Sequence, residues 1–572
     1  MNNLSLVRIS YPFLKPYFWQ IASALIVLPL SSFTYSVQPL ILQKAIDNLL
    51  VHGNYSQLWI YVLVLLLAVV FNFFLQVYQF LVMNKVGQNV VANIRLALFS
   101  HLEQLSMSFF DKTPVGRSVS RITSDMEQLA ESFVGGLVLI LLDIFNIIGI
   151  LLFMFYLNWQ LSLAVSIFLI PIYFMTEYYQ EMYRKANLEA RRELAKLNSF
   201  LQQNVVGITV VQALNSAQKS MEKFAENNLK YFKANDESIK ADARLSAGIE
   251  AISLIAIAAL IFVSSFPVLL NHGLSIGVIL AFIQYAQSLF EPIRNLSDRF
   301  TVVQAAFTSI ERMQELLDEP IEISDGLREL TADNHQPIIE FKNISFKYSS
   351  DDDHWVLRDL SFQVKQGQKL AIVGRTGSGK STIIKLLTRL YEPQQGSILI
   401  NGIDINQYKQ SDLREMVAVI HQDSYIFAGD LEANVSLGRD VSKLNMALVY
   451  PFLDAAPNLK MATVLSERGG NISSGEEQVL NFARAVVTDP QILVLDEATA
   501  KIDLKTERQI QTAMKGFLQN KTAIIIAHRL ETIRNCDVIL CLDSGRIVES
   551  GTHDELMLQR GVYRRLIEAN ER

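Results

Sequence analysis

The chain has 572 residues, a net charge of -6 and two cysteines, Cys536 and Cys541. This length exceeds what one compact core supports, so two or more domains are expected. The modest negative charge, with no basic stripe interleaved with aromatic residues, argues against a nucleic-acid partner. The cysteines have neither metal-ligand nor paired spacing, so we expect buried thiols in a reducing compartment and no disulfide framework.

Apolar composition divides the chain into two unlike halves. Residues 1 to about 300 carry long apolar runs with few charges inside them, whereas residues 338–572 alternate short apolar strands with polar helices, as in a soluble α/β domain. A helix needs about 20 mostly apolar residues to cross a bilayer. The six candidate spans are 21–42, 58–83, 133–157, 159–178, 248–270 and 274–297. The first lacks a small-residue cleavage site, so we expect it to be retained in the membrane.

The distribution of basic residues predicts the orientation of these spans. Residues 84–130 contain five Lys and Arg, residues 181–244 contain eleven, and the loops on the opposite side contain only Lys44. Basic residues favour the cytoplasmic side, so both long connections and both termini are expected there. The connections are polar and helix-like, so spans two to five should continue into the cytoplasm as long helices. Breakers at Pro114-Val115-Gly116 and Val206-Gly207 indicate turns at the tips or ordinary surface loops.

Asp143 is the clearest ionisable residue within a predicted span. A carboxylate at that depth is costly unless it faces the bundle, so Asp143 should either contact a substrate or proton or bond to a neighbouring helix. Glu177 and Glu250 lie nearer to predicted ends, where solvated carboxylates are the simpler interpretation. Glu250 is nevertheless kept as a candidate for a substrate cavity, as are the aromatic residues Phe282 and Tyr285, for which packing or lipid-facing roles are equally open.

The soluble half contains a glycine-rich loop between a strand and a helix. An apolar run, residues 370–373, precedes it, and a helix-like run begins at Thr382. The loop itself reads Gly374, Arg375, Thr376, Gly377, Ser378, Gly379, Lys380, Ser381. Glycines let backbone N–H groups close around phosphate oxygens at a helix N-terminus, Lys380 supplies charge to the β- and γ-phosphates, and the Ser381 hydroxyl can bind Mg²⁺. Residues 374–382 therefore predict an ATP and Mg²⁺ site.

A second strand, residues 492–495, ends in Asp496 and Glu497. Carboxylates at the carboxyl end of a sheet strand lie beside such a loop. There Asp496 can hold the water shell of Mg²⁺, and Glu497 can polarise the water that attacks the γ-phosphate.

The segment from Asn471 to Gln478 resembles the signature motif of ATP-binding-cassette (ABC) proteins. Its central residues are Ser473, Ser474, Gly475 and Glu476. Other segments resemble further motifs of that family in the expected order. These are Gln422 for the Q-loop, Asp503 for the D-loop, His528 for the switch histidine, Tyr348 for the adenine-stacking aromatic, and Ser466–Gly469 for the X-loop of exporters. Residues 109–116 and 207–211 resemble the two cytoplasmic loops of bacterial multidrug-type ABC exporters, so the similarity covers nearly the whole chain.

This resemblance implies the architecture and the roles of the site residues. Residues 1–320 would form an all-α six-helix transmembrane domain of ABC exporter type with two cytoplasmic coupling loops. A linker at 321–337 and an α/β phosphate-loop ATPase domain at 338–572 would follow. Gln422 would sense Mg²⁺ and the γ-phosphate, which His528 would contact. The signature residues would reach the nucleotide of a second subunit, so that each domain makes two incomplete half-sites.

Two departures from the family pattern stand out. The signature reads Ile-Ser-Ser-Gly-Glu at 472–476, where the family favours Leu-Ser-Gly-Gly-Gln, and this changes the site donated to the partner. Gln203 occupies a place where relatives often have Glu, which puts loop contacts in doubt rather than catalysis.

The resemblance implies ATP-driven export or flipping of an amphipathic drug, lipid or peptide across the cytoplasmic membrane, by alternating access. The partner would be a second copy of the chain or a homologous half-transporter. An ATP-gated channel or regulatory protein without stoichiometric transport is the alternative, although the presence of Glu497 and His528 favours a working ATPase. A soluble ABC ATPase acting on nucleic acid is disfavoured by the six spans.

Overall fold

The computed structural model describes residues 11–52, 57–265, 274–328, 339–349, 354–421, 425–496, 504–519, 521–526 and 530–570. Four predicted site residues, Gln422, Glu497, Asp503 and His528, lie outside this described part. The chain divides into two compact units. One unit is Met1–Glu103 with Val115–Glu319, and the other is Gln104–Pro114 with Pro320–Arg572.

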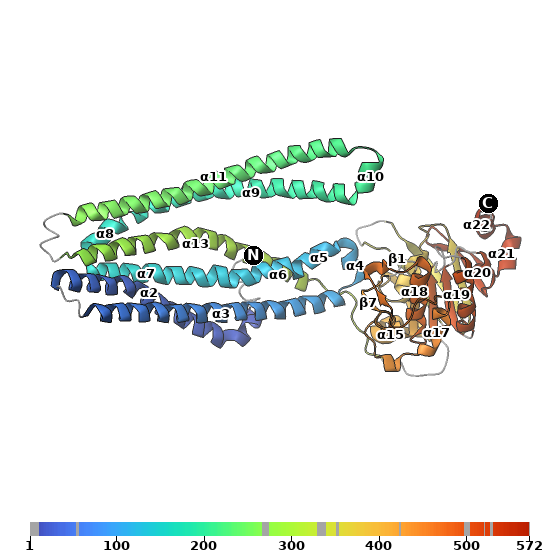
Figure 1. Cartoon of the computed structure of the whole chain (residues 1–572). Coiled ribbons are helices and arrows are strands. Elements are labelled where there is room, and N and C mark those ends of the chain that lie inside the picture. Colours follow the sequence, from blue (N-terminus) through green and yellow to red (C-terminus); the bar gives the residue numbers. More distant parts are fainter. Residues whose placement is uncertain are drawn as a thin grey trace. The chain divides into compact units, whose positions relative to one another are not determined.

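The first unit is helical (Figure 1). Its elements are η1 (Lys15–Tyr17), α2 (Phe18–His52), α3 (Leu58–Gln104), α5 (Val115–Ile122), α6 (Ser124–Glu131), the π-helical turn η3 (Ser132–Val138), α7 (Leu139–Leu157), α8 (Trp159–Ser166), α9 (Leu169–Val206), α10 (Ile208–Ala213), α11 (Ala217–Ser264) and α13 (Ile276–Leu317). The described residues include six helical segments long and apolar enough to cross a membrane, as predicted. They are Tyr11–Asn48, Leu58–Gln104, Val115–Leu157, Trp159–Val206, Ala217–Ser264 and Ile276–Ile293.

The helices run well beyond their apolar parts. The 47 residues of α3 would extend about 70 Å, more than twice the hydrocarbon thickness of about 30 Å. Figure 1 shows α9 and α11 side by side with the short α10 at their tip, and Val206-Gly207 marks the end of α9. The prediction that spans two to five continue as long helices is confirmed. The sixth continues as well, because α13 extends to Leu317 rather than ending near residue 297.

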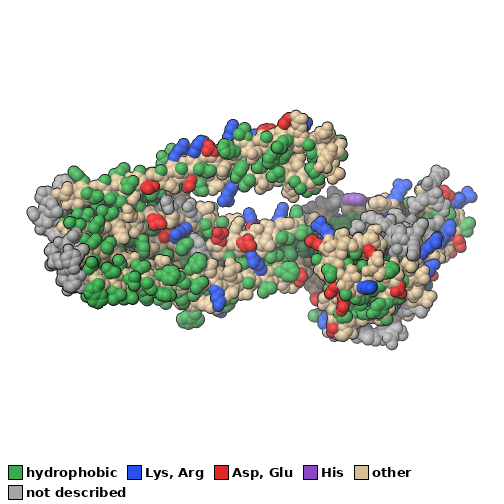
Figure 2. Space-filling model, in the orientation of Figure 1, with side chains coloured by type: hydrophobic (Ala, Val, Ile, Leu, Met, Phe, Trp, Pro, Cys, Tyr) green, Lys and Arg blue, Asp and Glu red, His purple; other side chains and the backbone are tan. Residues whose placement is uncertain are grey.

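Asn158 makes the tight connection between α7 and α8. Its side-chain Oδ1 accepts hydrogen bonds from the backbone N–H groups of Gln160 and Leu161, both at 3.0 Å. N–H groups in the first turn of a helix have no carbonyl partner within that helix, so the asparagine acts as an N-cap. Exposed apolar side chains of α3, among them Leu63, Phe71 and Phe74, belong to a surface on which hydrophobic side chains predominate (Figure 2). That composition suits a lipid-facing surface.

The second unit contains two sheets and a two-stranded ribbon. The first sheet has the order β2-β1-β4-β5, the second β12-β11-β3-β10-β9-β6, and β7 pairs with β8. The strands are β1 (Ile339–Phe346), β2 (Leu357–Val364), β3 (Lys369–Gly374), β4 (Gln395–Ile400), β5 (Ile403–Asp404), β6 (Val417–Ile420), β7 (Gly429–Asp430), β8 (Val464–Leu465), β9 (Ile492–Asp496), β10 (Thr522–Ile526), β11 (Val538–Asp543) and β12 (Arg546–Gly551). In the six-stranded sheet only the edge strand β12 is antiparallel to its neighbour.

Helices cover both faces of that sheet. The helices of this unit are α14 (Lys380–Leu387), α15 (Gln410–Met416), α16 (Leu431–Ser436), α17 (Tyr450–Leu453), α18 (Ser474–Val486), α19 (Leu504–Phe517), α20 (Leu530–Arg534), α21 (His553–Gln559) and α22 (Val562–Asn570), with the short α4 (Met107–Lys112) from the inserted segment. Alternate residues of β3 enter different cores. Leu370 and Ile372 pack with α14, whereas Ala371 and Val373 pack with α21 and α22. Cys536 and Cys541 are buried free thiols, as predicted.

Candidate functional site

The phosphate loop follows the carboxyl end of β3, which lies between β11 and β10. Gly377 and Gly379 adopt positive φ values of 82° and 102°, a region that L-residues with a side chain rarely occupy. A Cβ atom at Gly379 would also lie 2.6 Å from Leu357 Cδ2. Glycine is therefore required at Gly379, and it allows the loop to turn tightly into the first turn of α14.

Lys380 begins α14, and its side chain is nearly buried at 8% exposure. The ammonium donates hydrogen bonds to the carbonyl oxygens of Gly374 at 2.8 Å and Arg375 at 3.0 Å. Within the described residues, the buried Ser378 hydroxyl has no hydrogen-bond partner. A buried donor of this kind calls for an acceptor. The lysine, this hydroxyl and the N-terminus of α14 together fit the phosphate groups of a nucleotide.

Asp496 is the last residue of β9, at the same edge of the sheet as the phosphate loop. Backbone pairing places it opposite Ile526 of β10, and Ile526 in turn pairs with Ile372 of β3. Asp496 and Ser381, in the first turn of α14, are the described residues that could hold Mg²⁺ beside the phosphates.

The catalytic candidates outside the described residues all follow strands of this parallel sheet. Gln422 comes two residues after β6, Glu497 directly after β9, and His528 two residues after β10. Parallel strands end at the same edge of a sheet, so the described strands β6, β9 and β10 all end at the edge that carries the loop.

His421 is a residue of this edge that the sequence analysis missed. Desolvation lowers the pKa of its imidazole, and the nearby Asp496 carboxylate opposes that shift. The signal that could have found it is its position directly after a buried strand, next to Gln422.

Tyr348 lies beside the phosphate loop, as its predicted adenine-stacking role requires. Its hydroxyl is 3.0 Å from the Thr382 hydroxyl of α14, and its side chain is partly exposed. Lys385, one helical turn further along α14, has its Nζ 5.0 Å from the centroid of the Tyr348 ring. A partly exposed aromatic ring at the start of this helix can stack on a nucleotide base.

Ser473 is the N-cap of α18 and forms a reciprocal capping box with Glu476. The Glu476 Oε2 accepts hydrogen bonds from the Ser473 backbone N–H at 2.8 Å and from its hydroxyl at 3.0 Å. The Glu476 backbone N–H donates to the Ser473 hydroxyl at 3.3 Å. Gly475 is buried in the first turn, next to Ser474. The atypical Glu476 therefore stabilises the start of the helix and also places a negative charge within the signature.

Asp143 lies inside the helix bundle, 5% exposed, where it forms an ion pair with Arg299 of α13. Of the two alternatives drawn from the sequence, a bond to a neighbouring helix is the one that the structure shows. Phe282 and Tyr285 are both completely buried in the core that α7, α8, α11 and α13 share, and the Tyr285 hydroxyl donates to the Ser36 carbonyl at 2.7 Å. Of the roles that the sequence left open for these two residues, packing is the one that the structure shows, because neighbouring side chains of the same protomer surround both rings. Glu250 is exposed on α11.

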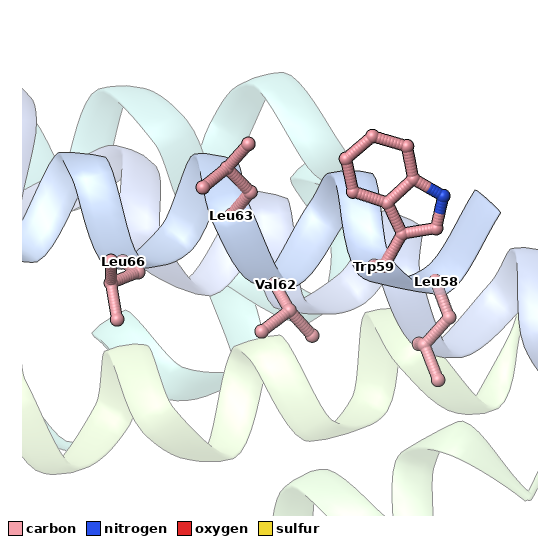
Figure 3. Close-up of a pocket in the computed structure, with 5 residues that line it drawn as sticks. All are labelled: Leu58, Trp59, Val62, Leu63 and Leu66. Atoms are coloured by element: carbon pink, nitrogen blue, oxygen red, sulfur yellow. The ribbon is translucent and has the colours of Figure 1, made fainter.

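Among the apolar hollows along the described membrane helices, two have volumes of about 570 Å³ and 460 Å³. Figure 3 shows one whose labelled residues, Leu58, Trp59, Val62, Leu63 and Leu66, all project from α3. Side chains from a single helix make an open surface hollow rather than an enclosed site. The other, about 460 Å³, lies between α2 and α7 and is lined by Pro29, Ser32, Phe33, Phe145, Ile148, Gly149, Leu152, Phe153 and Tyr156. Its size and apolar lining suit the hydrophobic part of an amphipathic molecule.

Comparison with known proteins agrees with this architecture. Residues 21–293 match the family model of the ABC transporter transmembrane region. Residues 357–500 match the ABC transporter family model. A Bacillus subtilis protein, YheH, named provisionally as a multidrug resistance ABC transporter ATP-binding/permease protein, is 34% identical over 87% of this chain and 75% of its own length. An ATP-dependent lipid A-core flippase of Idiomarina loihiensis is 33% identical over 90% of this chain and 88% of its own.

A solved structure of a bacterial Atm1-family ABC exporter with ATP bound has a TM-score of 0.76 to this chain. It is 26% identical, and the match covers 97% of this chain and 98% of that one. The chain belongs to the ABC transporter family. It is a multi-pass membrane protein of the bacterial ABC exporter type, a half-transporter whose ATPase is coupled to transport.

Proposed function

We propose that this chain exports or flips an amphipathic substrate across the cytoplasmic membrane by alternating access, as a dimer that binds ATP and Mg²⁺. The observation that carries the proposal is the phosphate cradle at the start of α14. This cradle contains the Lys380 ammonium, the buried Ser378 hydroxyl and two glycines with positive φ values. The same chain has six helical segments that are long and apolar enough to cross a membrane. ATP energy can thus act on membrane helices of the same polypeptide.

The dimer follows from the incomplete half-sites. The loop and Asp496 supply one side of the nucleotide, and residues 473–476 would supply the other side in a second chain, which is either a copy or a homologous half-transporter. Two nucleotides gripped mainly in the closed state can drive the transition, because moving a 1:99 equilibrium to 99:1 needs about 5.5 kcal/mol of differential binding. Glu497 would act as general base, with Gln422, His528 and Asp503 around the γ-phosphate.

The membrane arrangement is the second part of the proposal. Residues 1–320 are the membrane domain, 321–337 the linker and 338–572 the ATPase domain. The basic connections put both termini and the ATPase domain in the cytoplasm. The grouping of Gln104–Pro114 with the second unit supports a role for this loop as a coupling segment between α3 and α5.

The proposed substrate class is amphipathic lipids and drugs. Support comes from the apolar hollow between α2 and α7 and from relatives named for lipid A-core flipping and multidrug resistance. An amphipathic peptide is also included, because its apolar part could occupy the same hollow.

The test is ATP hydrolysis by the full chain in lipid vesicles, with a panel of lipids, amphipathic drugs and hydrophobic peptides added in turn. We expect amphipathic compounds to stimulate hydrolysis, and Lys380→Ala to give the background. Stimulation by hydrophilic compounds alone, or a stable monomer that hydrolyses ATP at the full rate, would contradict the proposal.

A further inference from the structure

A chain of direct contacts leads from the proposed base platform, Tyr348, to the inserted helix α4. All its members belong to the second unit, because α4 is part of Gln104–Pro114. The Tyr348 and Tyr391 rings meet edge to face, with centroids 5.2 Å apart and planes at 87°. Phe346 packs edge-on against both rings, at 5.0 Å and 5.7 Å. Rings that interlock in this way cannot tilt independently.

Lys385 ties the same two rings together from α14. Its Nζ lies 5.0 Å from the Tyr348 centroid and 5.5 Å from the Tyr391 centroid. A cation placed over both rings favours their present arrangement over alternatives in which one ring turns away. Since α14 begins at the phosphate loop, this lysine also ties the ring pair to the element that would carry the nucleotide phosphates.

The far end of this chain of contacts is a hydrogen bond to α4. The Tyr391 hydroxyl donates a hydrogen bond to the Asp111 Oδ2, and the tyrosine is buried, with 6% of its surface exposed. Burial is the main cause that raises the pKa of Tyr391, and the bond to Asp111 adds to it, so the phenol keeps its proton and stays a donor at neutral pH. A hydrogen bond to a charged acceptor is directional and stronger than a neutral one.

We propose that Tyr391 is a positioning residue that transmits the state of the base platform at Tyr348 to helix α4 through Asp111. The proposal rests on the function proposed above and deepens it, because it adds a path from the base of the nucleotide to a coupling helix. A base stacked on Tyr348 fixes the plane of that ring. Tyr391 must then hold one orientation, and its hydroxyl holds Asp111 and α4 in one place. The segments that flank α4 in the chain are α3 and α5, so a displacement of α4 reaches two membrane helices through the backbone.

A second anchor makes α4 a suitable reporter. Glu322 Oε2 accepts hydrogen bonds from the Ser106 hydroxyl at 2.8 Å and the Ser108 hydroxyl at 2.5 Å. These bonds lie at the N-terminal end of α4, away from Asp111, so they hold the helix when the Tyr391 contact is lost. Lys112 is exposed at the C-terminal end of α4. Labelling of a cysteine placed there therefore reports a local change at this end of α4 and not the detachment of the whole helix.

The experiment measures the reaction of Lys112→Cys with a water-soluble maleimide in the full chain, with and without Mg²⁺ and a non-hydrolysable ATP analogue. The native thiols give little background, because burial raises the pKa of Cys536 to about 12 and that of Cys541 to about 11. We expect the analogue to change the labelling rate, and Tyr391→Phe to reduce that change by roughly tenfold, as expected for one lost hydrogen bond to a charged group. The affinity for the analogue should stay within about twofold, because the phenylalanine ring preserves the packing.

Two further variants separate this role from a general loss of packing. Tyr408→Phe also removes a buried hydroxyl, which donates to the Ile400 carbonyl at 3.3 Å, but it has no bond to α4, so the labelling response should persist. Asp111→Ala should reproduce Tyr391→Phe, and the double variant should be no worse than either. A full response in Tyr391→Phe, an equal loss in Tyr408→Phe, or additive losses would overturn the proposal. Since the analogue is not hydrolysed and no cargo is present, failure of the transport function would leave this readout intact.

Discussion

The carboxylate of Asp143 forms an ion pair with the guanidinium of Arg299, and this pair joins α7 to α13. The Arg299 Nη1 also donates to the Leu139 carbonyl at 2.6 Å, so one side chain holds the start of α7 at two points. The π-helical turn Ser132–Val138 immediately precedes that start. The ion pair thus fixes the first turns of α7, directly after a turn that departs from α-helical geometry.

Loss of either partner of this pair should destabilise the membrane unit. Removing one partner of a buried ion pair typically costs about 3–5 kcal/mol, because the other charge is left uncompensated. We expect Asp143→Leu and Arg299→Leu each to lower the thermal unfolding temperature and the ATPase activity together. The double variant should recover most of the stability. Thermal unfolding in detergent gives the measurement.

The pair Arg121–Glu315, whose carboxylate is exposed, provides the control. The Arg121 Nη2 and the Glu315 Oε2 are 2.8 Å apart, but the Glu315 side chain is 59% exposed. Solvent screening reduces such pairs to about 0–1 kcal/mol, so Glu315→Gln should have little effect on unfolding. Stable single variants at Asp143 with impaired transport alone would show instead that this carboxylate serves the substrate.

The extent of the helices shows what the sequence could and could not predict. The apolar runs located all six spans, because burial of the backbone in lipid demands long apolar helices. They could not locate the end of α13, which continues beyond its apolar part to Leu317 and packs there against α6. There Arg312 pairs with Asp125 of α6 at 3.1 Å, and such pairs between distant segments leave no periodic signal in the sequence.

The candidate site also contains some residues whose role the sequence could predict and others whose role it could not. The sequence could predict a tight turn at Gly377 and Gly379, because the positive φ values that the loop adopts there favour glycine. For Phe282 and Tyr285 the sequence left cavity and packing roles open, because an aromatic residue on a membrane helix has the same sequence signal whether it faces a cavity or a neighbouring helix. The contacts that decide between these cases, such as the bond from Tyr285 to the Ser36 carbonyl, join residues far apart in the chain.

A side chain at Gly379 should abolish nucleotide binding. Gly379→Ala would place a side chain at a φ of +102° and 2.6 Å from Leu357 Cδ2, so the loop or the buried Leu357 side chain must shift to accept it. Gly402 is a matched control: its φ is +77°, but an added Cβ would meet nothing within 4 Å. Gly402→Ala should therefore cost only about 1–2 kcal/mol of backbone strain and leave the affinity for ATP unchanged. Equilibrium binding of a fluorescent ATP analogue measures both, and normal affinity in Gly379→Ala would refute the assigned loop geometry.

Neutralising the atypical signature glutamate should raise ATP hydrolysis. Glu476→Gln retains a carbonyl oxygen that can accept the Ser473 N–H bond, but it removes the negative charge that would face the partner's γ-phosphate. Exposed charge interactions are worth about 0–1 kcal/mol, so we expect a rise of up to about fivefold, larger at low salt. The assay is steady-state ATPase activity at two ionic strengths.

The comparison variant for this test is Glu476→Ala, which also removes the charge but breaks the capping box. It should lose about 1 kcal/mol of stability, measured by thermal unfolding, where Glu476→Gln should not. A fall in activity for Glu476→Gln, with stability unchanged, would mean that the carboxylate itself is needed in the signature.

The central claim is that hydrolysis at this chain's own nucleotide site drives transport. The most direct measurement is ATP-dependent transport, by reconstituted vesicles, of the compound that stimulates ATPase activity most strongly in the panel, with the native chain, Glu497→Gln and Lys380→Ala side by side. The native chain should transport only with ATP and Mg²⁺. Glu497→Gln should bind ATP and retain it while hydrolysis and transport slow by about 10²–10⁴-fold, as for loss of a general base, and Lys380→Ala should bind ATP poorly. Transport that continues at the native rate in Glu497→Gln, or without ATP, would contradict the account.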